Sequence, residues 1–340
     1  MRNNFLKIAV VGSGSWGTAL AVLLSRNGHD VKLWGHKNNH VQNLLNDCEN
    51  KKYLPGIFFP ESLLPVSDLK CAVESANLVV MAVPSHAMRE IFTKVSPFID
   101  DGCRLVSAIK GVENGTLLTM TQAMGEVLFK SGRASKDIEI GVLSGPSFAQ
   151  EVAKCSPTAV TIAFKNIETA IEIQKVFVND YFRVYASHDV LGIELCAALK
   201  NVIAIAAGVC DGLGYGLNTR AALITRGLAE MRRLGKSINA EDPTFLGLGG
   251  IGDLILTCTG GLSRNRMVGI QLGEGKCLSK IVDEMSMVAE GVKNTKSVYD
   301  LAQKHNIEMP IIEQVYQIIY NNKECSLAVR DLLKRDLKIE

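Results

Sequence analysis

A lysine inside an apolar run is the residue of this chain best suited to proton chemistry. Lys200 lies within the stretch Leu195–Val209, among Ala, Leu and Ile side chains. Burial disfavours the charged form of a lysine and lowers its pKa, so such a side chain can accept a proton near neutral pH. Asn201 beside it would orient a ligand. The alternative is a structural ion pair, with Glu194 or Asp253 as the partner.

A second pattern is suited to binding an anion. Ser263, Arg264 and Asn265 follow a Gly-Gly pair and precede a helical run. A hydroxyl cap and an arginine at the start of a helix both favour a phosphate group. We therefore expect an anion at Arg264, whereas Arg266 is interpreted as structural or peripheral.

A glycine-rich turn close to the N-terminus predicts a dinucleotide site. Gly12, Gly14 and Gly17 form the pattern GxGxxG directly after the β-branched run Lys7–Val11 and at the start of a predicted helix, Thr18–Asn27. The glycines allow a tight turn, an approach of the backbone to a pyrophosphate and close packing of the helix on the sheet. The alternative is a tight turn that binds nothing.

The end of the second predicted strand bears on which dinucleotide is bound. NAD sites usually carry an acidic residue about 20 residues beyond the glycines. Here Trp34 and Gly35 are followed by His36 and Lys37, with no acid. This basic pair favours NADP(H), without excluding NAD(H), unless both side chains are ordinary solvated loop residues.

The hydrophobic periodicity changes once along the chain, near His188 and Asp189. Before this point, short apolar runs alternate with amphipathic stretches, which indicates a parallel sheet with helices on both faces. After it the periodicity is helical. The predicted strands are Lys7–Val11, Val31–Trp34, Leu78–Val83, Arg104–Ile109, Ile138–Leu143, Val160–Phe164 and Arg183–Ala186. The predicted later helices are Ile193–Val209, Thr219–Leu234, Ser279–Met285, Val292–His305 and Ile311–Tyr320. We expect a Rossmann-like doubly wound α/β domain over residues 1–189 and an all-helical substrate-binding and catalytic domain over 190–340.

Composition excludes several classes of protein. The chain has 340 residues, 47% hydrophobic, and a net charge of only +2, which argues against global disorder and against a nucleic-acid partner. Its 9 cysteines are scattered, as expected for buried thiols in a reducing cytoplasm, and no metal site is expected. The apolar stretch Val190–Cys210 carries Glu194, Lys200 and Asn201, so a buried helix is expected there rather than integral membrane association.

Long blocks of the sequence resemble the NAD(P)-dependent glycerol-3-phosphate dehydrogenases of the bacterial type. The blocks stand in the family's order at Ile8–Ala21, Val79–Ile91, Ser107–Glu113, Leu143–Ala153, Ala197–Gly227, Gly247–Gly269 and Val288–Val292. The resemblance implies interconversion of dihydroxyacetone phosphate and sn-glycerol 3-phosphate with NAD(P)H, for glycerophospholipid synthesis. It also implies a helical half like the C-terminal domain of 6-phosphogluconate dehydrogenase. His36 departs from the family, which usually has arginine there.

The same resemblance implies roles for individual residues. Lys200 would be the proton acceptor, and Asp253 would bond the substrate hydroxyl or orient Lys200. The implied substrate-binding residues are Lys110, Gly145, Ser147, Lys200, Asp253, Ser263, Arg264 and Asn265. The implied cofactor-binding residues are Gly12, Gly14, Ser15, Trp16, Gly17, His36, Lys37, Lys110, Ala149, Arg264, Val288 and Glu290. Position alone supports Lys110, which follows a predicted strand at the carboxyl edge where open sheets bind ligands.

Two other functions remain open on the sequence alone. A hydroxyacid or 6-phosphogluconate dehydrogenase would share the glycine turn and a helical second domain. A non-catalytic NAD(P)-binding sensor would keep Gly12, Gly14 and Gly17 but would need neither Lys200 nor Arg264. In each case the ligand is a small molecule, and we leave a homodimer open as the assembly.

Overall fold

The chain forms two compact units in the computed structural model, which describes residues 5–133, 138–285 and 289–336. One unit consists of Met1–Ile109 and Met120–Val190, and the other of Lys110–Thr119 and Leu191–Glu340. The short segment Lys110–Thr119 thus belongs by its contacts to the second unit, although it stands within the first half of the sequence.

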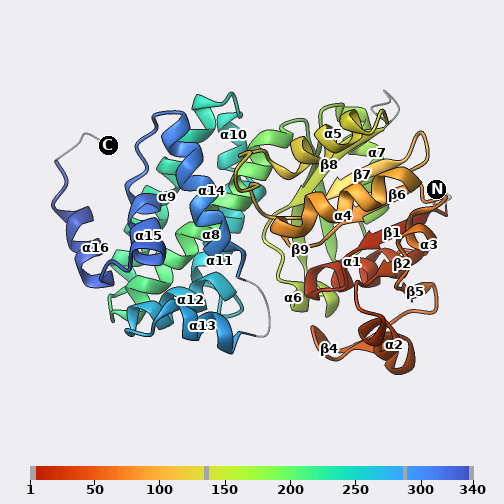
Figure 1. The fold of residues 1–340 in the computed structure, drawn as a ribbon, viewed down its shortest axis with the longest axis horizontal. Helices are drawn as coiled ribbons and strands as arrows, with labels where there is room; N and C mark the ends of the chain where they lie inside the picture. The colour runs from red at the N-terminus through yellow and green to blue at the C-terminus, as the bar shows by residue number, and fades with distance from the viewer. Residues whose placement is uncertain (1–4, 134–137, 286–288, 337–340) are drawn as a thin grey trace. The chain divides into compact units, whose positions relative to one another are not determined.

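An eight-stranded sheet forms the middle of the first unit (Figure 1), in the order β10-β9-β8-β7-β6-β1-β2-β5. Its strands are β1 Lys7–Val11, β2 Asp30–Trp34, β5 Leu63–Val66, β6 Leu78–Met81, β7 Arg104–Ser107, β8 Glu139–Ser144, β9 Thr158–Phe164 and β10 Phe182–Ser187. A separate hairpin pairs β3 (Glu49–Asn50) with β4 (Leu54–Phe58). Strand β1 lies between β2 and β6, parallel to both, so the chain winds outward from β1 in both directions. Ligands of doubly wound sheets bind at this switch point.

Helices of the first unit pack in two groups against the sheet. Helix α1 contacts α6 and α7, whereas α4 contacts α3 and α5. Their bounds are α1 Ser15–Arg26, α2 Asn38–Asp47, α3 Leu69–Val73, α4 Met88–Val95, α5 Met120–Lys130, α6 Ala149–Ala153 and α7 Ile167–Phe177. The predicted Rossmann-like sheet with a helical second part is confirmed.

The expectation that all strands run parallel is wrong at one point. Strand β9 runs antiparallel to β8, although β9 and β10 are parallel to each other. The connection after β8 contains only the five-residue helix α6, which packs on α1. The chain therefore returns beside β8 in the opposite direction, as a connection without a full crossover helix allows.

The second unit is helical around α8, Val190–Gly212. The other helices are α9 Leu217–Ser237, α10 Asp242–Phe245, α11 Asp253–Thr259, α12 Arg264–Gly273, α13 Leu278–Glu284, α14 Glu290–Lys304, α15 Pro310–Asn321 and α16 Cys325–Leu333, with a π-helical turn at Leu248–Gly252. Among the described residues, α8 alone is a helix long and apolar enough by itself to cross a membrane, but 94% of its apolar window is buried in the protein. It is accordingly the core helix of this unit.

Gly235 has a different role from the one expected. The predicted helix Thr219–Leu234 stops directly before it, as is usual for a glycine at a helix end, but α9 continues through it to Ser237. A Cβ at Gly235 would lie 2.1 Å from Phe245 Cζ, so the glycine is needed for close packing of the Phe245 ring on α9.

Candidate active site

The glycine-rich turn is shaped by the close packing of backbone. Gly12 has φ +125°, and a Cβ there would lie 2.6 Å from the carbonyl oxygen of Ala82 at the end of β6. A Cβ at Gly17 would lie 1.8 Å from the carbonyl oxygen of Gly12. Around Gly14, in contrast, no atom lies within 4 Å of a built Cβ. The turn is packed on the protein side and open on the side from which a phosphate would approach.

Hydrogen-bond donors gather at the same turn. Helix α1 begins at Ser15, and its N-cap Gly14 supplies no side-chain bond to the first-turn N–H groups. The indole N–H of Trp16 is buried without a partner in the described part of the chain. Free N–H groups at a helix N-terminus are donors to pyrophosphate oxygens. These residues fit the dinucleotide that the sequence predicts.

Basic side chains surround the end of β2. His36 and Lys37 are exposed, and Lys37 is the N-cap of α2. Burial lowers the pKa of His40, and the nearby charges of Lys52, His36 and Lys37 lower it further. The positive region at this strand end therefore extends beyond the predicted pair to Lys52.

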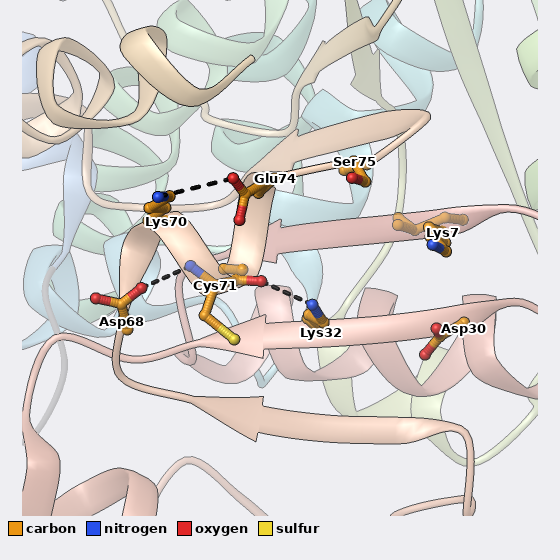
Figure 2. Close-up of a pocket in the computed structure, with 11 residues that line it drawn as sticks. Lys7, Asp30, Lys32, Asp68, Lys70, Cys71, Glu74 and Ser75 are labelled. Atoms are coloured by element: carbon orange, nitrogen blue, oxygen red, sulfur yellow. Dashed lines mark hydrogen bonds and ion pairs between the residues drawn. The ribbon is translucent and has the colours of Figure 1, made fainter. Parts of the chain in front are cut away.

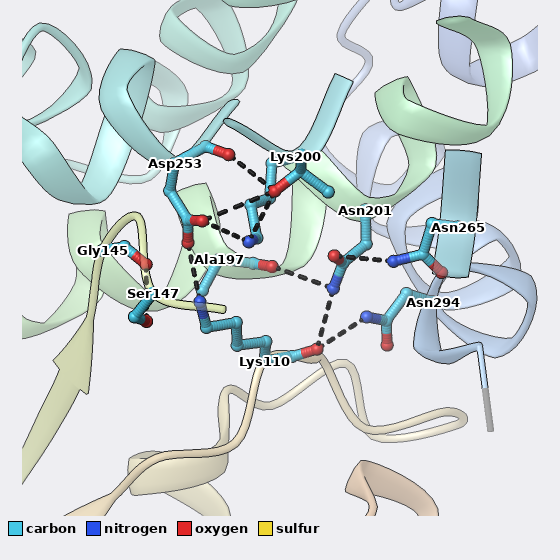
Figure 3. A network of polar contacts seen from close by, with 10 residues as sticks. Lys110, Gly145, Ser147, Ala197, Lys200, Asn201, Asp253, Asn265 and Asn294 are labelled. Atoms are coloured by element: carbon cyan, nitrogen blue, oxygen red, sulfur yellow. Dashed lines mark hydrogen bonds and ion pairs between the residues drawn. The ribbon is translucent and has the colours of Figure 1, made fainter. Parts of the chain in front are cut away.

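In the second unit, two lysines share one buried carboxylate (Figure 3). Lys200 Nζ donates to Asp253 Oδ1 over 2.5 Å, and Lys110 Nζ donates to Asp253 Oδ2 over 2.8 Å. Lys200 Nζ also donates to Thr257 Oγ1 over 2.9 Å. Of the two partners considered for Lys200, the structure selects Asp253. We call Lys110, Lys200, Asp253 and Thr257 the lysine cluster.

The charge balance of the lysine cluster disfavours two protonated lysines. Lys200 is 4% exposed and Asp253 1%. Burial lowers the pKa of Lys200 to about 7, with Asp253 opposing the shift and Lys110 adding to it. Burial acts to raise the pKa of Asp253, but the two lysines outweigh it and its pKa is lowered. A single carboxylate facing two ammonium groups thus leaves Lys200 able to exchange a proton near neutral pH.

The turn before α11 explains how Asp253 reaches this position. Asp253 is the first residue of α11 and follows the glycine-rich π turn Leu248–Gly252. A Cβ at Gly250 would lie 2.2 Å from the carbonyl oxygen of Phe245, and one at Gly249 would lie 2.6 Å from Ile193 Cδ1. The glycines permit a sharp entry, which brings the start of α11 against α8.

A chain of amide hydrogen bonds extends from the lysine cluster. The main-chain oxygen of Lys110 accepts from Asn294 Nδ2 over 2.9 Å and from Asn201 Nδ2 over 3.4 Å. Asn201 Oδ1 accepts from Asn265 Nδ2 over 2.9 Å. Asn265 Oδ1 in turn accepts from the Gly291 N–H over 2.9 Å. Helices α8, α12 and α14 are therefore linked around Lys110.

The anion motif lies at the start of α12. Ser263 is its N-cap and accepts from the Arg266 N–H over 3.3 Å, as the sequence predicts. Burial lowers the pKa of Arg264, and nearby Glu290 opposes the shift. Arg266 donates to Asp211 over 2.7 Å, which fits the structural role expected for it.

The predicted residues after β8 lie in the first unit. Gly145 has φ +147°, and a Cβ there would lie 2.9 Å from Val160 Cα, so only glycine fits. Ser147 Oγ donates to the carbonyl oxygen of Gly145 over 3.0 Å rather than capping α6, which begins at Ala149 and has no side-chain cap. Val288 lies outside the described residues.

Two polar residues of this site were not predicted. Thr257 stands four residues after Asp253, and on a helix that spacing places both on one face. Asn294 stands four residues after Glu290, and its only sequence signal is a polar residue in a predicted helix. Both are buried, at 4% and 1% exposure.

A cavity of about 550 Å³ lies elsewhere in the first unit, beside the amino ends of β1 and β2 (Figure 2). Four of its charged side chains have partners within the protein. Lys32 Nζ donates to the Cys71 carbonyl, Asp68 accepts from the Cys71 N–H, and Lys70 pairs with Glu74. This depression is at the opposite strand edge from the glycine turn, and we assign no ligand to it.

Comparison with known proteins gives one consistent result. The models of the NAD-dependent glycerol-3-phosphate dehydrogenase N-terminus and C-terminus match residues 7–170 and 189–330. A glycerol-3-phosphate dehydrogenase [NAD(P)+] of Desulfotalea psychrophila is 57% identical over 100% of both chains. Another, of Citrifermentans bemidjiense, is 52% identical over 98% of both. The crystal structure of the Coxiella burnetii glycerol-3-phosphate dehydrogenase matches with a TM-score of 0.92 at 40% identity, over 97% of this chain and 99% of that one. The chain belongs to the NAD-dependent glycerol-3-phosphate dehydrogenase family.

Proposed function

We propose that this protein interconverts dihydroxyacetone phosphate and sn-glycerol 3-phosphate with NAD(P)H, as the names of its relatives indicate. The observation that carries the proposal is the buried lysine cluster. Oxidising a secondary alcohol requires a base for the hydroxyl proton, and Lys200 is a buried amine whose pKa is lowered to about 7. The bound dinucleotide supplies the hydride acceptor or donor.

Lys200 is the proton acceptor in this proposal. Its neutral amine takes the hydroxyl proton during oxidation, and its ammonium form polarises the carbonyl and returns the proton during reduction. Asp253 holds Lys200 Nζ through Oδ1. The same carboxylate holds Lys110 through Oδ2, which presents a second positive group to the substrate oxygen.

The remaining residues bind the substrate. Arg264, with Ser263 and Asn265 at the start of α12, is assigned the phosphate group, because a helix N-terminus and a guanidinium both favour a dianion. Gly145 and Ser147 are assigned as further substrate contacts. Under this proposal a substrate without phosphate loses most of its binding.

Most dinucleotide contacts are assigned to the region 1–189, and the catalytic and substrate groups to 190–340 together with Lys110, Gly145 and Ser147. Gly12, Gly14, Gly17 and the helix start at Ser15 and Trp16 would hold the pyrophosphate. The basic end of β2 supports a preference for NADP(H) through His36 and Lys37. The other assigned cofactor contacts are Lys110, Ala149, Arg264, Val288 and Glu290.

A cytoplasmic location and a homodimeric state are further proposals. All nine cysteines are free thiols, which suits a reducing compartment. Analytical ultracentrifugation of the purified protein would test the dimer, and a monomer at micromolar concentration would contradict it. We also propose that the product serves glycerophospholipid synthesis.

The direct test is an assay of NADPH oxidation in the presence of dihydroxyacetone phosphate. The rate is measured as the loss of absorbance at the nicotinamide band. We expect turnover with dihydroxyacetone phosphate and much weaker turnover with dihydroxyacetone, glyoxylate or 6-phosphogluconate. Tight NADPH binding without turnover on any of them would favour a non-catalytic sensor instead. Preferred turnover of a hydroxyacid pair would assign a different substrate.

A further inference from the structure

Asn294 on α14 bonds to the lysine cluster and yet has no role in the reaction described above. Its Nδ2 donates to the main-chain oxygen of Lys110 over 2.9 Å, and its side chain is buried. Its Oδ1 is buried without a hydrogen-bond partner in the part of the chain that the structure describes. Burying an amide oxygen without a donor costs stability. Stability alone therefore does not explain an asparagine at this position.

Asn294 is brought to Lys110 by the close approach of α14 to α8 and α12. Gly291, three residues earlier on α14, donates its N–H to Asn265 Oδ1. A Cβ at Gly291 would lie 2.7 Å from the carbonyl oxygen of Asn201 and 2.8 Å from Asn265 Oδ1. The glycine lets α14 lie directly on α8 and α12, and this places Asn294 against the Lys110 segment.

Lys110 is held at both ends as a result. Its main-chain oxygen accepts from Asn294 and, over a longer distance, from Asn201. Its ammonium group donates to Asp253 Oδ2. A lysine side chain has several freely rotating bonds, and ordering it costs conformational entropy. The two hydrogen bonds to its main-chain oxygen fix the backbone from which the Lys110 side chain extends. The ion pair with Asp253 therefore has to offset less of this loss of entropy.

We propose that Asn294 is a positioning residue of the reaction, which holds the main chain of Lys110 so that the ammonium group of Lys110 stays on the carboxylate of Asp253. This inference rests on the proposed function. Its consequence concerns Lys200, because the two lysines compete for one carboxylate. If Lys110 leaves Asp253, Lys200 loses a neighbouring like charge and gains the whole carboxylate, so its pKa rises.

The charged and titratable groups near Lys200 make this consequence specific. Lys110 and Asp253 are the charged groups that shift its pKa. Cys258 on α11 is close to it, but burial raises the pKa of that thiol to about 12, so it stays neutral. A change in the pH dependence on altering Asn294 therefore reports on the position of Lys110.

The test compares Asn294→Leu, which keeps a branched shape, and Asn294→Ala with the control Ser297→Ala on the same helix. Ser297 is fully buried, and among the described residues its hydroxyl bonds along its own helix, to the main-chain oxygen of Asn294. For both Asn294 variants we expect a native melting curve and roughly fivefold lower turnover, the effect of losing one hydrogen bond of about 1 kcal/mol.

We also expect the rising limb of the pH profile for glycerol 3-phosphate oxidation to move to higher pH by roughly 0.5 unit. Ser297→Ala should lower the melting temperature and leave that limb unchanged.

A pH profile that keeps its native position in both Asn294 variants would overturn the inference, as would failure of both to fold, since the role would then be structural. Titration of lysine side chains by NMR, with Lys200→Met to assign the signal, gives the same comparison without turnover. If the native enzyme has no activity on glycerol 3-phosphate, the proposed function fails. The NMR comparison then still decides whether Asn294 controls the Lys110–Asp253 pair.

Discussion

The glycine-rich turn and the lysine cluster are built in opposite ways. The turn after β1 lies within one short segment, Gly12–Gly17, and requires that Gly12 and Gly17 carry no side chain. The lysine cluster requires particular side chains, and it draws them from Lys110, Lys200 and Asp253, which are far apart in the sequence. A substitution at the turn should therefore act by disturbing the packing of the backbone, whereas a substitution in the lysine cluster should act by changing the charges.

The largest expected effect is in the lysine cluster. Lys200→Met should cut turnover roughly 10²–10⁴-fold, the usual contribution of a general acid–base group. Binding of NADPH, measured by fluorescence titration, should persist. Lys200→Arg should not restore turnover, because a guanidinium does not release its proton at these pH values. A folded Lys200→Met variant with near-native turnover would place the base elsewhere.

The next largest effect is expected at the turn. Gly17→Ala should abolish measurable dinucleotide binding and destabilise the protein by about 1–3 kcal/mol, because its Cβ cannot fit beside the Gly12 carbonyl. Gly14→Ala is the matched variant, since its Cβ meets open space. It should melt like the native protein but bind NADPH more weakly. Equal stability of the two variants in thermal melts would contradict the packing described here.

Substrate phosphate recognition should come third. Arg264→Ala should lower kcat/KM for dihydroxyacetone phosphate by about 10- to 100-fold, as expected for losing charge-assisted hydrogen bonds of about 1.5–3 kcal/mol. The weak activity with dihydroxyacetone should change much less. Equal losses with both substrates, measured under the same conditions, would remove Arg264 from phosphate recognition.

The smallest effect is expected at the end of β2, where both side chains are exposed. Replacing His36 with Asp and Lys37 with Ser should shift the ratio of kcat/KM values from NADPH towards NADH by roughly tenfold, because an acid suits the ribose hydroxyl and repels a 2′-phosphate. Lys165→Ser, at an exposed lysine outside this region, serves as the control. A native enzyme that already prefers NADH strongly would show that the basic pair has been misinterpreted.

The same contrast explains what the sequence could predict. The glycine turn depends on neighbours within six residues and on a strand before it, so GxGxxG could be interpreted directly. The sequence alone did not decide whether Lys200 pairs with Glu194 or with Asp253. That choice depends on the packing of α11 against α8, which the local sequence does not determine. The lysine cluster and Asn294 depend on such contacts between distant segments.

The two errors in the fold have similar causes. The apolar run of β9 is equally compatible with parallel and antiparallel pairing, and its direction depends on the short connection through α6. Gly235 has the residue type of a helix end, but its neighbour Phe245 comes from another helix and makes glycine necessary within α9. In each case a tertiary contact overrides a local signal.

The central claim is that Lys200 exchanges the substrate proton with a pKa lowered by burial, and the pH dependence of kcat/KM in both directions tests it most directly. The neutral amine is needed for oxidation, so that rate should rise with pH through about 7, whereas the ammonium form is needed for reduction, so that rate should fall over the same range. The substrate phosphate has a second pKa of about 6, and its ionisation would change the oxidation and reduction rates in the same direction. Titration of Lys200 changes them in opposite directions, so the two causes can be distinguished. Opposite profiles with a shared inflection near pH 7 are the predicted result. Profiles that bend together, or that show no inflection in this range, would contradict the account.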